Sequence, residues 1–447
     1  MNAHASNSPR PVRYRASGGL AGRIRIPGDK SISHRALMLS ALAVGHSRIT
    51  GLLEGEDVLA TAAALRQMGA AIERDGDGSW HVDGVGVGGL FQPDSALDMG
   101  NSGTSTRLLL GLLASHAISA TFTGDASLSG RPMARVTDPL SAMGAEFHAS
   151  PGGTLPLMVR GLVPAVPIRY RLPMASAQVK SAILLAALNT PGTTTVIEPV
   201  PTRDHSERML AGFGADVQVE TDAEGARAIS ITGPVDLRPQ DIVVPGDPSS
   251  AAFFIVAALI VPGSDVVIEN VGLNPTRAGL IAVLRDMGGQ IAELDRRNVG
   301  GEPVADLHVR SSALSGIDVD PAIAASMIDE FPVLFVAAAL AKGVTRTTGL
   351  DELRVKESDR LAVMAAGLKA IGVPVEEQED GLIITGSGGE PLAGGGPVAT
   401  HLDHRIAMSF AVAGLVSVHG VEVDDTRPIA TSFPGFADLL AGLQAAS

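Results

Sequence analysis

A weak internal repeat is the feature that most restricts the folds open to this chain. A pattern that predicts an apolar helix, a small polar turn, an apolar strand and a second helix recurs along the sequence, and each copy ends near a glycine. A glycine at the end of a helix predicts a left-handed C-terminus, and strands are predicted to follow it, as at 70–73 and 215–219. The closing phrases are Met68-Gly69-Ala70, Met143-Gly144-Ala145, Phe213-Gly214-Ala215, Met287-Gly288-Gly289 and Ile371-Gly372-Val373.

The copies also share a polar turn that opens a helix. Apolar helices are predicted behind such turns, over Leu108–Leu113, Ile183–Leu188 and Phe253–Ile260, and two more begin near Met327 and His404. The opening turns are Gly28-Asp29-Lys30-Ser31, Gly100-Asn101-Ser102-Gly103-Thr104, Met174-Ala175-Ser176-Ala177-Gln178 and Gly246-Asp247-Pro248-Ser249-Ser250.

The size of the repeat predicts two lobes. Six units of roughly 70–80 residues are too large for a solenoid and too small for typical domains, whereas three together have ordinary domain size. The similar phrases at 27–29 and 245–247 mark the breaks, with hinge segments near 27–30 and 244–248. One lobe then covers residues 30–246 and the other covers residues 1–29 with 247–447. A cleft between lobes is a usual place for a ligand.

The composition excludes several classes of protein. The formal net charge of −14 argues against nucleic-acid binding, which needs Lys and Arg clustered on a basic face. The absence of cysteine removes disulfides, thiolate metal sites and a cysteine nucleophile. The longest apolar run, 251–261, is shorter than the ~20 residues that a bilayer requires. The arginines before residue 28 faintly resemble a transit peptide, but Pro9 and Pro11 oppose an amphipathic helix, so a cytoplasmic protein is expected.

The segment Gly28–Arg35 brings cations and a hydroxyl to the start of a helix. Asp29 is a good helix N-cap, and Lys30 and Ser31 fall in the first turn, where free N–H groups and the helix dipole favour an anion. Arg35 lies one turn beyond Ser31, so both can face one ligand. A capped amphipathic helix with solvated charges is the alternative interpretation.

Four more clusters combine cations with hydroxyls or sharp turns. Taken singly, each is consistent with solvated charge or local ion pairing. Cations brought together would repel one another unless anions neutralised them, and arginine binds phosphate and carboxylate through paired hydrogen bonds. The sequence therefore predicts a pair of substrates with several negative charges. The clusters are Gly100–Arg107 with Arg131, Ser176–Lys180 with 202–205, Leu353–Leu361 and 403–405, and the cations are Lys30, Arg35, Arg131, Arg203, Lys356, Arg360 and Arg405.

Two acids stand apart from these cations. Asp329 precedes the apolar helix predicted over Val333–Leu340 and is either its cap or a functional carboxylate. Glu357 is either an ion-pair partner or an acid tuned for proton transfer. A helix here would place Lys356 and Arg360 on one face at i,i+4. His205 and His404 lie beside acids and arginines, and no spacing of His, Asp and Glu indicates a metal site.

Several long motifs follow one another in a recognisable order: Gly28-Asp29-Lys30-Ser31, Gly100–Arg107, Arg131-Pro132-Met133, Ser176-Ala177-Gln178, Leu353–Leu361, Asp403-His404-Arg405 and Thr431-Ser432-Phe433-Pro434. In these motifs, and from about Gly22 to the C-terminus, the sequence resembles the 5-enolpyruvylshikimate-3-phosphate (EPSP) synthase family. The resemblance implies an α/β (α+β) fold of two similar lobes, each with three βαβαββ units about a pseudo-threefold axis. It also implies transfer of the enolpyruvyl group of phosphoenolpyruvate to shikimate 3-phosphate with release of phosphate, upstream of chorismate and the aromatic amino acids. No cofactor or metal is implied.

The resemblance implies roles for individual residues. Asp329 takes the proton from the 5-hydroxyl of the sugar ring, and Glu357 with Lys30 protonates the methylene carbon. The tetrahedral ketal then loses phosphate. The implied residues for shikimate 3-phosphate are Lys30, Ser31, Arg35, Ser176, Ala177, Gln178, Arg203, Asp329 and Lys356, and those for phosphoenolpyruvate are Lys30, Gly103, Arg131, Gln178, Arg360 and Arg405. The expected partners are thus two small molecules, without nucleic acid or membrane, and a monomer is expected.

Two positions depart from the pattern of many family members. Ala177 replaces a serine, so that its backbone alone can contact phosphate, and Thr431 stands where many members have a lysine. Both changes resemble a bacterial subgroup that tolerates the inhibitor glyphosate. That tolerance accompanies an alanine where this chain has Gly103, so we expect glyphosate to fit here and to compete with phosphoenolpyruvate.

Two other functions stay open on the sequence alone. A related enzyme with the same fold moves enolpyruvyl to UDP-N-acetylglucosamine and usually uses a cysteine acid, which this chain lacks. A two-lobed protein that binds phosphorylated metabolites without catalysis would release no phosphate from the two substrates.

Overall fold

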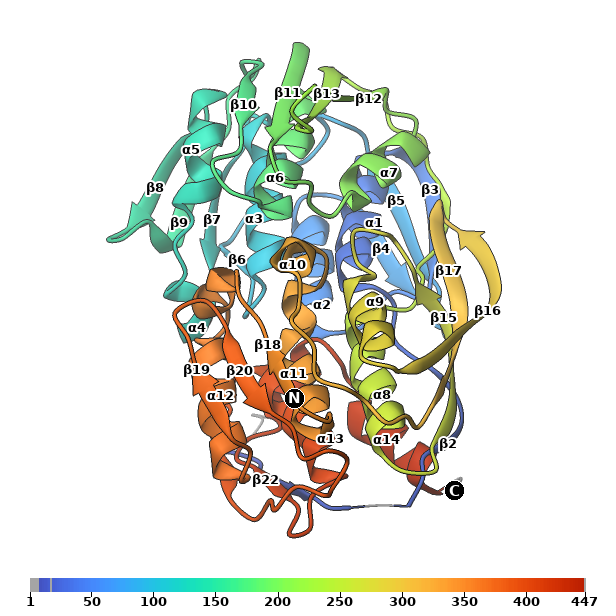
Figure 1. Cartoon of the computed structure of the whole chain (residues 1–447). Coiled ribbons are helices and arrows are strands. Elements are labelled where there is room, and N and C mark those ends of the chain that lie inside the picture. Colours follow the sequence, from blue (N-terminus) through green and yellow to red (C-terminus); the bar gives the residue numbers. More distant parts are fainter. Residues whose placement is uncertain (1–7, 17, 446–447) are drawn as a thin grey trace. The chain divides into compact units, whose positions relative to one another are not determined.

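The computed structural model describes residues 8–16 and 18–445, so the parts of the predicted second lobe at residues 1–7, 17, 446 and 447 lie outside the described residues. The chain divides into two compact units. Unit 1 comprises the described parts of 1–26, 246–297 and 303–447, and unit 2 comprises 27–245 with 298–302. Helices alternate with strands in both units (Figure 1), so the predicted α/β (α+β) class is confirmed.

Unit 2 contains three sheets of one design within the described residues. Each sheet begins with a parallel strand pair and continues with two antiparallel pairings. In two of the sheets a helix connects the parallel strands, as the crossover between parallel strands requires. The strand orders are β14 (Asp241–Val243), β3 (Val44–Thr50), β5 (Trp80–Val85), β4 (Ala71–Arg74); β6 (Leu97–Asp98), β7 (Ser119–Thr123), β9 (Thr154–Arg160), β8 (Glu146–Ser150); and β10 (Arg169–Arg171), β11 (Gly192–Glu198), β13 (Arg227–Gly233), β12 (Val217–Thr221).

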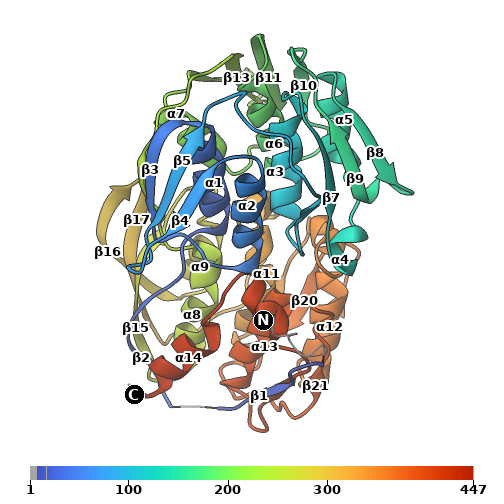
Figure 2. The ribbon, with the colours of Figure 1, turned by 180° about the vertical axis from the view of Figure 1, so that it is seen from behind.

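The helices of unit 2 divide into a buried set and a covering set. Helices α1, α3 and α6 are buried along nearly their whole length, and in Figures 1 and 2 the sheets lie outside them. The helices are α1 (Lys30–Leu42), α2 (Glu56–Gln67), α3 (Gly103–Ala114), α4 (Ala126–Ser129), α5 (Ala134–Ala142), α6 (Ala177–Ala187) and α7 (His205–Gly212).

Unit 1 has a similar but not identical plan: the described residues form one four-stranded sheet and two three-stranded sheets, and one of the three-stranded sheets contains antiparallel pairings only. Its buried helices are α8, α11 and α13. The strand orders are β16 (Gln290–Val299), β17 (Glu302–Arg310), β15 (Asp265–Gly272), β2 (Ala21–Arg25); β18 (Val344–Arg346), β20 (Leu382–Thr385), β19 (Val375–Glu377); and β1 (Val12–Tyr14), β22 (Val421–Val423), β21 (Pro397–Val398). The helices are α8 (Pro248–Ile260), α9 (Gly279–Asp286), α10 (Ala324–Met327), α11 (Phe331–Leu340), α12 (Arg360–Ala370), α13 (His404–Gly414) and α14 (Phe436–Ala445), with 3-10 turns η1 (Pro321–Ile323), η2 (Ile328–Glu330), η3 (Asp351–Val355) and η4 (Arg427–Thr431).

The chain passes between the units after residues 26 and 245 and again on both sides of the short segment 298–302, and distant segments complete the sheets beside the first two passages. It leaves unit 1 after Ile26 and returns to it at Gly246. Strand β2 pairs in parallel with β15, and β14 pairs in parallel with β3. The backbone N–H of Asp29 donates to the carbonyl of Pro245 over 2.7 Å, so the two ends of the long unit 2 segment lie side by side.

The predicted left-handed glycines are confirmed in all five copies. Gly69, Gly144, Gly214, Gly288 and Gly372 have φ values between 85° and 101°, and each lies directly after a helix C-cap residue. A left-handed backbone brings the Cβ of an L-residue too close to the carbonyl oxygen, and glycine avoids that clash. The repeat seen in the sequence is therefore a repeat of helix endings.

The apolar helices form the cores of the two units. All ten residues of α11 are buried. The stretch Pro321–Leu340 is long and apolar enough to cross a membrane by length and composition, but 72% of its most apolar window is buried inside the protein. This burial is typical of a core helix.

The pair Gly212 and Gly214 offers a direct test of the helix-ending geometry. Gly212 ends α7 with an ordinary backbone conformation and nothing within 4 Å of an added Cβ, whereas Gly214 has φ = 91°. We expect Gly214→Ala to lower the free energy of unfolding by about 1–2 kcal/mol. Gly212→Ala is expected to leave it unchanged or to raise it by about 1 kcal/mol. Urea unfolding followed by circular dichroism measures both, and equal midpoints for the two variants would contradict the prediction.

Candidate active site

Helix α1 begins as the sequence predicts. The backbone N–H of Ile32 donates to Oδ1 of Asp29 over 2.9 Å, so Asp29 is the N-cap and Lys30 is the first helical residue. The Lys30 ammonium forms an ion pair with the carboxylate of Asp57 on α2. Lys30 is therefore held in place by a counter-charge that its own motif does not contain.

Arg35 is buried one turn further along α1. Its Nε donates to Oγ of Ser206 over 2.8 Å, and its Nη2 donates to Oγ of Ser181 over 2.6 Å. Its Nη1 donates to the carbonyl of Ser31 over 2.9 Å. These bonds fix the guanidinium among α1, α6 and α7.

The beginnings of α3 and α6 lie next to each other. Nη1 of Arg107 donates to Oε1 of Gln178 over 3.0 Å, and Nε2 of Gln178 donates to Oγ1 of Thr104 over 3.2 Å. Ser176 is the N-cap of α6, and Ala177 is its first helical residue. The free N–H groups of two helix N-termini thus lie close together, which favours an anion.

Gly103 faces two guanidinium groups at the start of α3. A Cβ added at Gly103 would lie 2.9 Å from Nη1 of Arg107 and 3.2 Å from Nη1 of Arg131. Nη2 of Arg131 donates to Oδ1 of Asn101 over 2.8 Å and to Oγ of Ser127 over 3.2 Å. Only a residue without a side chain leaves both arginines undisturbed. Arg203 is half-buried in the loop before α7.

In unit 1 a second cluster surrounds Asp329. Its Oδ1 lies 3.3 Å from Nη1 of Arg360 and 3.7 Å from Nζ of Lys356, and its carbonyl accepts from Nη1 of Arg405 over 3.1 Å. Nη2 of Arg360 also donates to Oε2 of Glu357 over 2.5 Å. The structure thus brings the five predicted residues of this unit into one cluster, with Lys356 and Arg360 at the carboxylate of Asp329, Arg405 at its carbonyl and Glu357 at Arg360.

Arg360 is the centre of this cluster and is 1% exposed. Its Nε donates to Oδ2 of Asp403 over 2.8 Å. Burial alone would lower the pKa of the guanidinium, but attraction by Asp403, Glu357 and Asp329 raises it above its ordinary value. Arg360 therefore keeps its charge at every physiological pH.

Two expectations for unit 1 are wrong. Residues 356–359 are not helical: η3 ends at Val355 and α12 begins at Arg360, because Asp359 caps α12 by accepting from the N–H of Ala362. Lys356 and Arg360 meet at Asp329 without sharing a helix face. The alternative that Asp329 caps the apolar helix is also wrong, because the N-cap residue of α11 is Glu330.

His34, the residue before Arg35 on α1, lies within a chain of hydroxyl groups. Its Nδ1 is 2.8 Å from Oγ1 of Thr61, which is 2.7 Å from Oγ of Ser105. Ser105 in turn contacts the α3 N-cap residue Ser102 over 2.6 Å. Burial, together with the charges of Lys30 and Arg35, holds the pKa of His34 well below its usual range. A neutral His34 thus connects the beginnings of α1 and α3.

Sequence reasoning missed the partners that hold the predicted cations. Asp57, Ser181, Ser206 and Asp403 are separated from their cations by between 27 and 171 positions. Asp403 carried one signal, since it precedes a helix as an N-cap does, and it accepts from the N–H of Arg405 over 2.9 Å. No local sequence pattern distinguished Asp57, Ser181 and Ser206 from ordinary polar residues.

The two histidines singled out in the sequence do not form a metal site. Nδ1 of the buried His205 lies 2.9 Å from Oε1 of Glu302, and His404 is the first residue of α13. Among the described residues no group of three or more His, Asp or Glu is placed to hold a metal ion. Thr431 is in η4, with its hydroxyl donating to the carbonyl of Pro428 over 2.7 Å.

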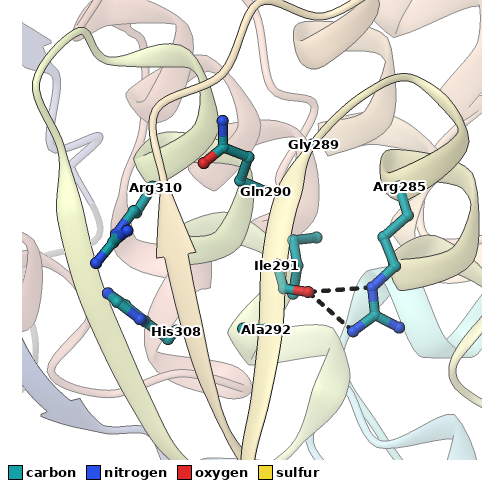
Figure 3. Close-up of a pocket in the computed structure, with 7 residues that line it drawn as sticks. All are labelled: Arg285, Gly289, Gln290, Ile291, Ala292, His308 and Arg310. Atoms are coloured by element: carbon teal, nitrogen blue, oxygen red, sulfur yellow. Dashed lines mark hydrogen bonds between the residues drawn. The ribbon is translucent and has the colours of Figure 1, made fainter.

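A surface pocket in unit 1 lies apart from the predicted residues. It has a volume of about 390 Å³ and is lined by residues of α9, β16 and β17, including Arg285, His308 and Arg310 (Figure 3). Arg285 donates to the carbonyl of Ile291, and both His308 and Arg310 pair with Asp265. Arg285 also forms an ion pair with Glu293 over 3.1 Å, so both arginines of this pocket already have a carboxylate partner.

A fold of two units, each with repeated sheets and buried helices, is also found in solved structures. The solved structure of the enolpyruvyl transferase NikO from Streptomyces tendae shares this fold, with a TM-score of 0.74 at 19% identity over 97% of this chain and 98% of that one. The chain belongs to the EPSP synthase (3-phosphoshikimate 1-carboxyvinyltransferase) family, whose model matches residues 14–440.

Similar relatives cover nearly the whole chain. The 3-phosphoshikimate 1-carboxyvinyltransferase of Sphingopyxis alaskensis is 74% identical over 438 residues, which are 97% of this chain and 98% of that protein. That of Novosphingobium aromaticivorans is 73% identical over 434 residues, 96% of this chain and 98% of that one. The solved EPSP synthase of Acinetobacter baumannii has a TM-score of 0.86 at 49% identity, covering 97% of both chains.

The environment of His34 predicts a loss of stability in acid. The unfolded chain takes up a proton on this residue below about pH 6.5, whereas the folded protein does not. The free energy of unfolding therefore falls as the pH drops through this range, by about 1 kcal/mol between pH 7 and pH 5.5. His34→Asn retains a hydrogen-bonding group and removes this contribution. Urea unfolding at both pH values measures it, and an equal loss in wild type and variant would contradict a neutral His34.

Proposed function

We propose that this chain transfers the enolpyruvyl group of phosphoenolpyruvate to the 5-hydroxyl of shikimate 3-phosphate and releases phosphate. The observation that carries this proposal is the unit 1 cluster. One carboxylate, Asp329, lies against Lys356 and Arg360, and a second, Glu357, lies on the same guanidinium. Two acids held by fixed cations are what a reaction with two proton transfers between anions needs.

The two carboxylates take different roles in the reaction. Asp329 accepts the proton of the 5-hydroxyl while the hydroxyl oxygen forms a bond to the central carbon of phosphoenolpyruvate. Glu357, with Lys30, gives a proton to the methylene carbon, which becomes a methyl group in a tetrahedral ketal. The bond between the central carbon and the phosphate oxygen then breaks, and the phosphate leaves with the electron pair and the proton held by Asp329. Glu357 takes a proton back from the methyl group as the double bond forms again. Atoms and protons balance over the two steps.

The cations contribute by holding two anions that repel each other. Guanidinium and ammonium groups fixed before the substrates arrive stabilise developing negative charge without reorganisation in the reaction step. Orientation of the two bound reactants can itself supply several kcal/mol. We assign shikimate 3-phosphate to Lys30, Ser31, Arg35, Ser176, Ala177, Gln178, Arg203, Asp329 and Lys356, and phosphoenolpyruvate to Lys30, Gly103, Arg131, Gln178, Arg360 and Arg405.

The enzyme so proposed works in aromatic amino acid biosynthesis as a cytoplasmic monomer without a cofactor. Its partners are two small molecules. Release of phosphate from phosphoenolpyruvate, measured with and without shikimate 3-phosphate, tests the reaction directly. Phosphate that appears only when both are present supports it, whereas a protein that binds both and releases none is a clamp without catalysis.

The role of Asp329 predicts a split between turnover and binding. We expect Asp329→Asn to lower kcat by at least about 100-fold, because a positioned base contributes on this scale. The dissociation constant of shikimate 3-phosphate should change by less than about threefold, since the amide keeps the shape of the carboxylate. Phosphate release and calorimetry measure the two quantities.

The matched control is Asp318→Asn in the same unit. Asp318 is exposed and accepts from Nη1 of Arg346 over 3.2 Å, so it makes a comparable ion pair at the surface. We expect this variant to keep the wild-type kcat. Equal kcat values for the two variants would remove Asp329 from the reaction.

Gly103 predicts sensitivity to glyphosate. The Cβ in Gly103→Ala displaces the tips of Arg107 and Arg131, which are flexible side chains, so the fold is expected to tolerate it. We expect the inhibition constant for glyphosate to rise by about tenfold or more, and the KM for phosphoenolpyruvate to rise less. Inhibition kinetics against phosphoenolpyruvate measure both. Wild-type inhibition that is non-competitive, or no stronger than in the variant, contradicts the assignment.

A further inference from the structure

Lys180 is a charged side chain that the proposed reaction leaves unexplained. It lies on α6 with a fully buried side chain. Its Nζ is 2.9 Å from Oε1 of Glu198 and 2.8 Å from Oε1 of Glu207. A lysine is almost never buried so completely unless carboxylates pair with it.

One arm of this cluster reaches the loop that carries Arg203. Glu198 ends β11, and its Oε1 accepts from the backbone N–H of Thr202 over 2.9 Å and also from the Thr202 hydroxyl. Thr202 directly precedes Arg203. Lys180 therefore holds the carboxylate that fixes the backbone beside Arg203.

The other arm reaches Arg35. Glu207 is on α7 next to Ser206, whose hydroxyl accepts from Nε of Arg35. Ser181, the neighbour of Lys180 on α6, accepts from Nη2 of the same guanidinium, and the two serine hydroxyls are 2.7 Å apart. Through its ion pair with Glu207, Lys180 thus connects α6 and α7, the two helices whose serine hydroxyls accept hydrogen bonds from Arg35.

The cluster is not arranged for stability alone. Glu198 and Glu207 are buried, and among the described residues neither Oε2 receives a hydrogen bond. Arg227 approaches Oε2 of Glu198 to 4.0 Å and balances the second negative charge. Replacing a buried ionic group by apolar residues often leaves a protein equally or more stable, so such a group is weak evidence for a stabilising role.

We propose that Lys180 is a positioning residue for shikimate 3-phosphate. Through Glu198 and Glu207 it sets the places of Arg203 and Arg35. This inference rests on the proposed function, which assigns those two arginines to shikimate 3-phosphate. A remote change that misplaces bound groups by about 1 Å can lower a reaction rate by as much as about 100-fold, and we expect the affinity for shikimate 3-phosphate to fall as well when its arginines are displaced. The loss should fall on shikimate 3-phosphate and spare phosphoenolpyruvate, most of whose proposed ligands lie on other elements.

The test measures the dissociation constant of shikimate 3-phosphate by calorimetry and the KM for phosphoenolpyruvate at saturating shikimate 3-phosphate. We expect Lys180→Met to raise the dissociation constant by at least about tenfold. The KM for phosphoenolpyruvate should change by less than about twofold. Glu198→Gln and Glu207→Gln keep a hydrogen-bond acceptor and leave one carboxylate on Lys180, so they carry the test if Lys180→Met does not fold. Each should raise the dissociation constant by a smaller factor, and Lys180→Arg should restore part of the affinity.

A control separates positioning from general destabilisation. Val159→Ala removes buried apolar atoms from β9 in the same unit, away from both arginines. It should lower the melting temperature and leave the dissociation constant within about twofold. Equal losses of affinity in Val159→Ala and Lys180→Met, or wild-type affinity in Lys180→Met and both glutamine variants, would overturn the positioning role.

Direct variants distinguish this failure from a failure of the proposed function. Arg203→Gln and Arg35→Gln should each raise the dissociation constant of shikimate 3-phosphate more than the Lys180 variant does. If they have no effect, the assignment of the arginines is wrong and the inference falls with it. If they weaken binding and Lys180→Met does not, the assignment stands and the positioning role alone is wrong.

Discussion

A guanidinium buried as deeply as that of Arg360 can exist only because carboxylates surround it. Asp403, Glu357 and Asp329 replace the water that the charge has lost. The same carboxylates then fix the orientation of the group and hold the loop at 356–359 and the beginnings of α12 and α13 against one another. The arrangement of this part of the candidate active site therefore follows from one electrostatic requirement: a cation inside the protein needs carboxylates around it.

The cations of unit 2 that we assign to substrate are held in a different way, mostly by neutral groups. Arg35 is held mainly by serine hydroxyls, Arg107 by the amide of Gln178 and Arg131 by the amide of Asn101, whereas Lys30 has the carboxylate of Asp57. Hydroxyl and amide partners orient these guanidinium groups through hydrogen bonds. Carboxylates predominate in unit 1, where the proposed mechanism needs groups that exchange protons. The two units have a similar plan of helices and sheets and differ in the side chains at the helix beginnings.

Local patterns in the sequence were reliable where local physics decides the outcome. The N-cap Asp29, the glycines after five helices and the apolar helices α3, α6, α8, α11 and α13 follow from hydrogen bonding, backbone sterics and hydrophobic burial within a few residues. The prediction of a helical pair at Lys356 and Arg360 was wrong because Asp359 is itself a helix cap. A new helix begins after this cap, so Lys356 lies outside the helix that contains Arg360. The i,i+4 spacing of the two residues gives no indication of this break.

The sequence by itself determined the repeat, the ends of its helices, the cores and the list of cations and acids that chemistry could use. The tertiary structure alone decided the pairings: strand β14 with β3, Lys30 with Asp57, Arg35 with Ser206, Arg360 with Asp403. The members of each pair are tens to hundreds of positions apart in the sequence. For the side-chain pairs, the sequence does not indicate which Asp or Ser is the partner of a given cation. Only the packing of helices and sheets makes one choice satisfy the buried charge, because a desolvated cation stabilises the arrangement in which its counter-groups lie within hydrogen-bonding distance.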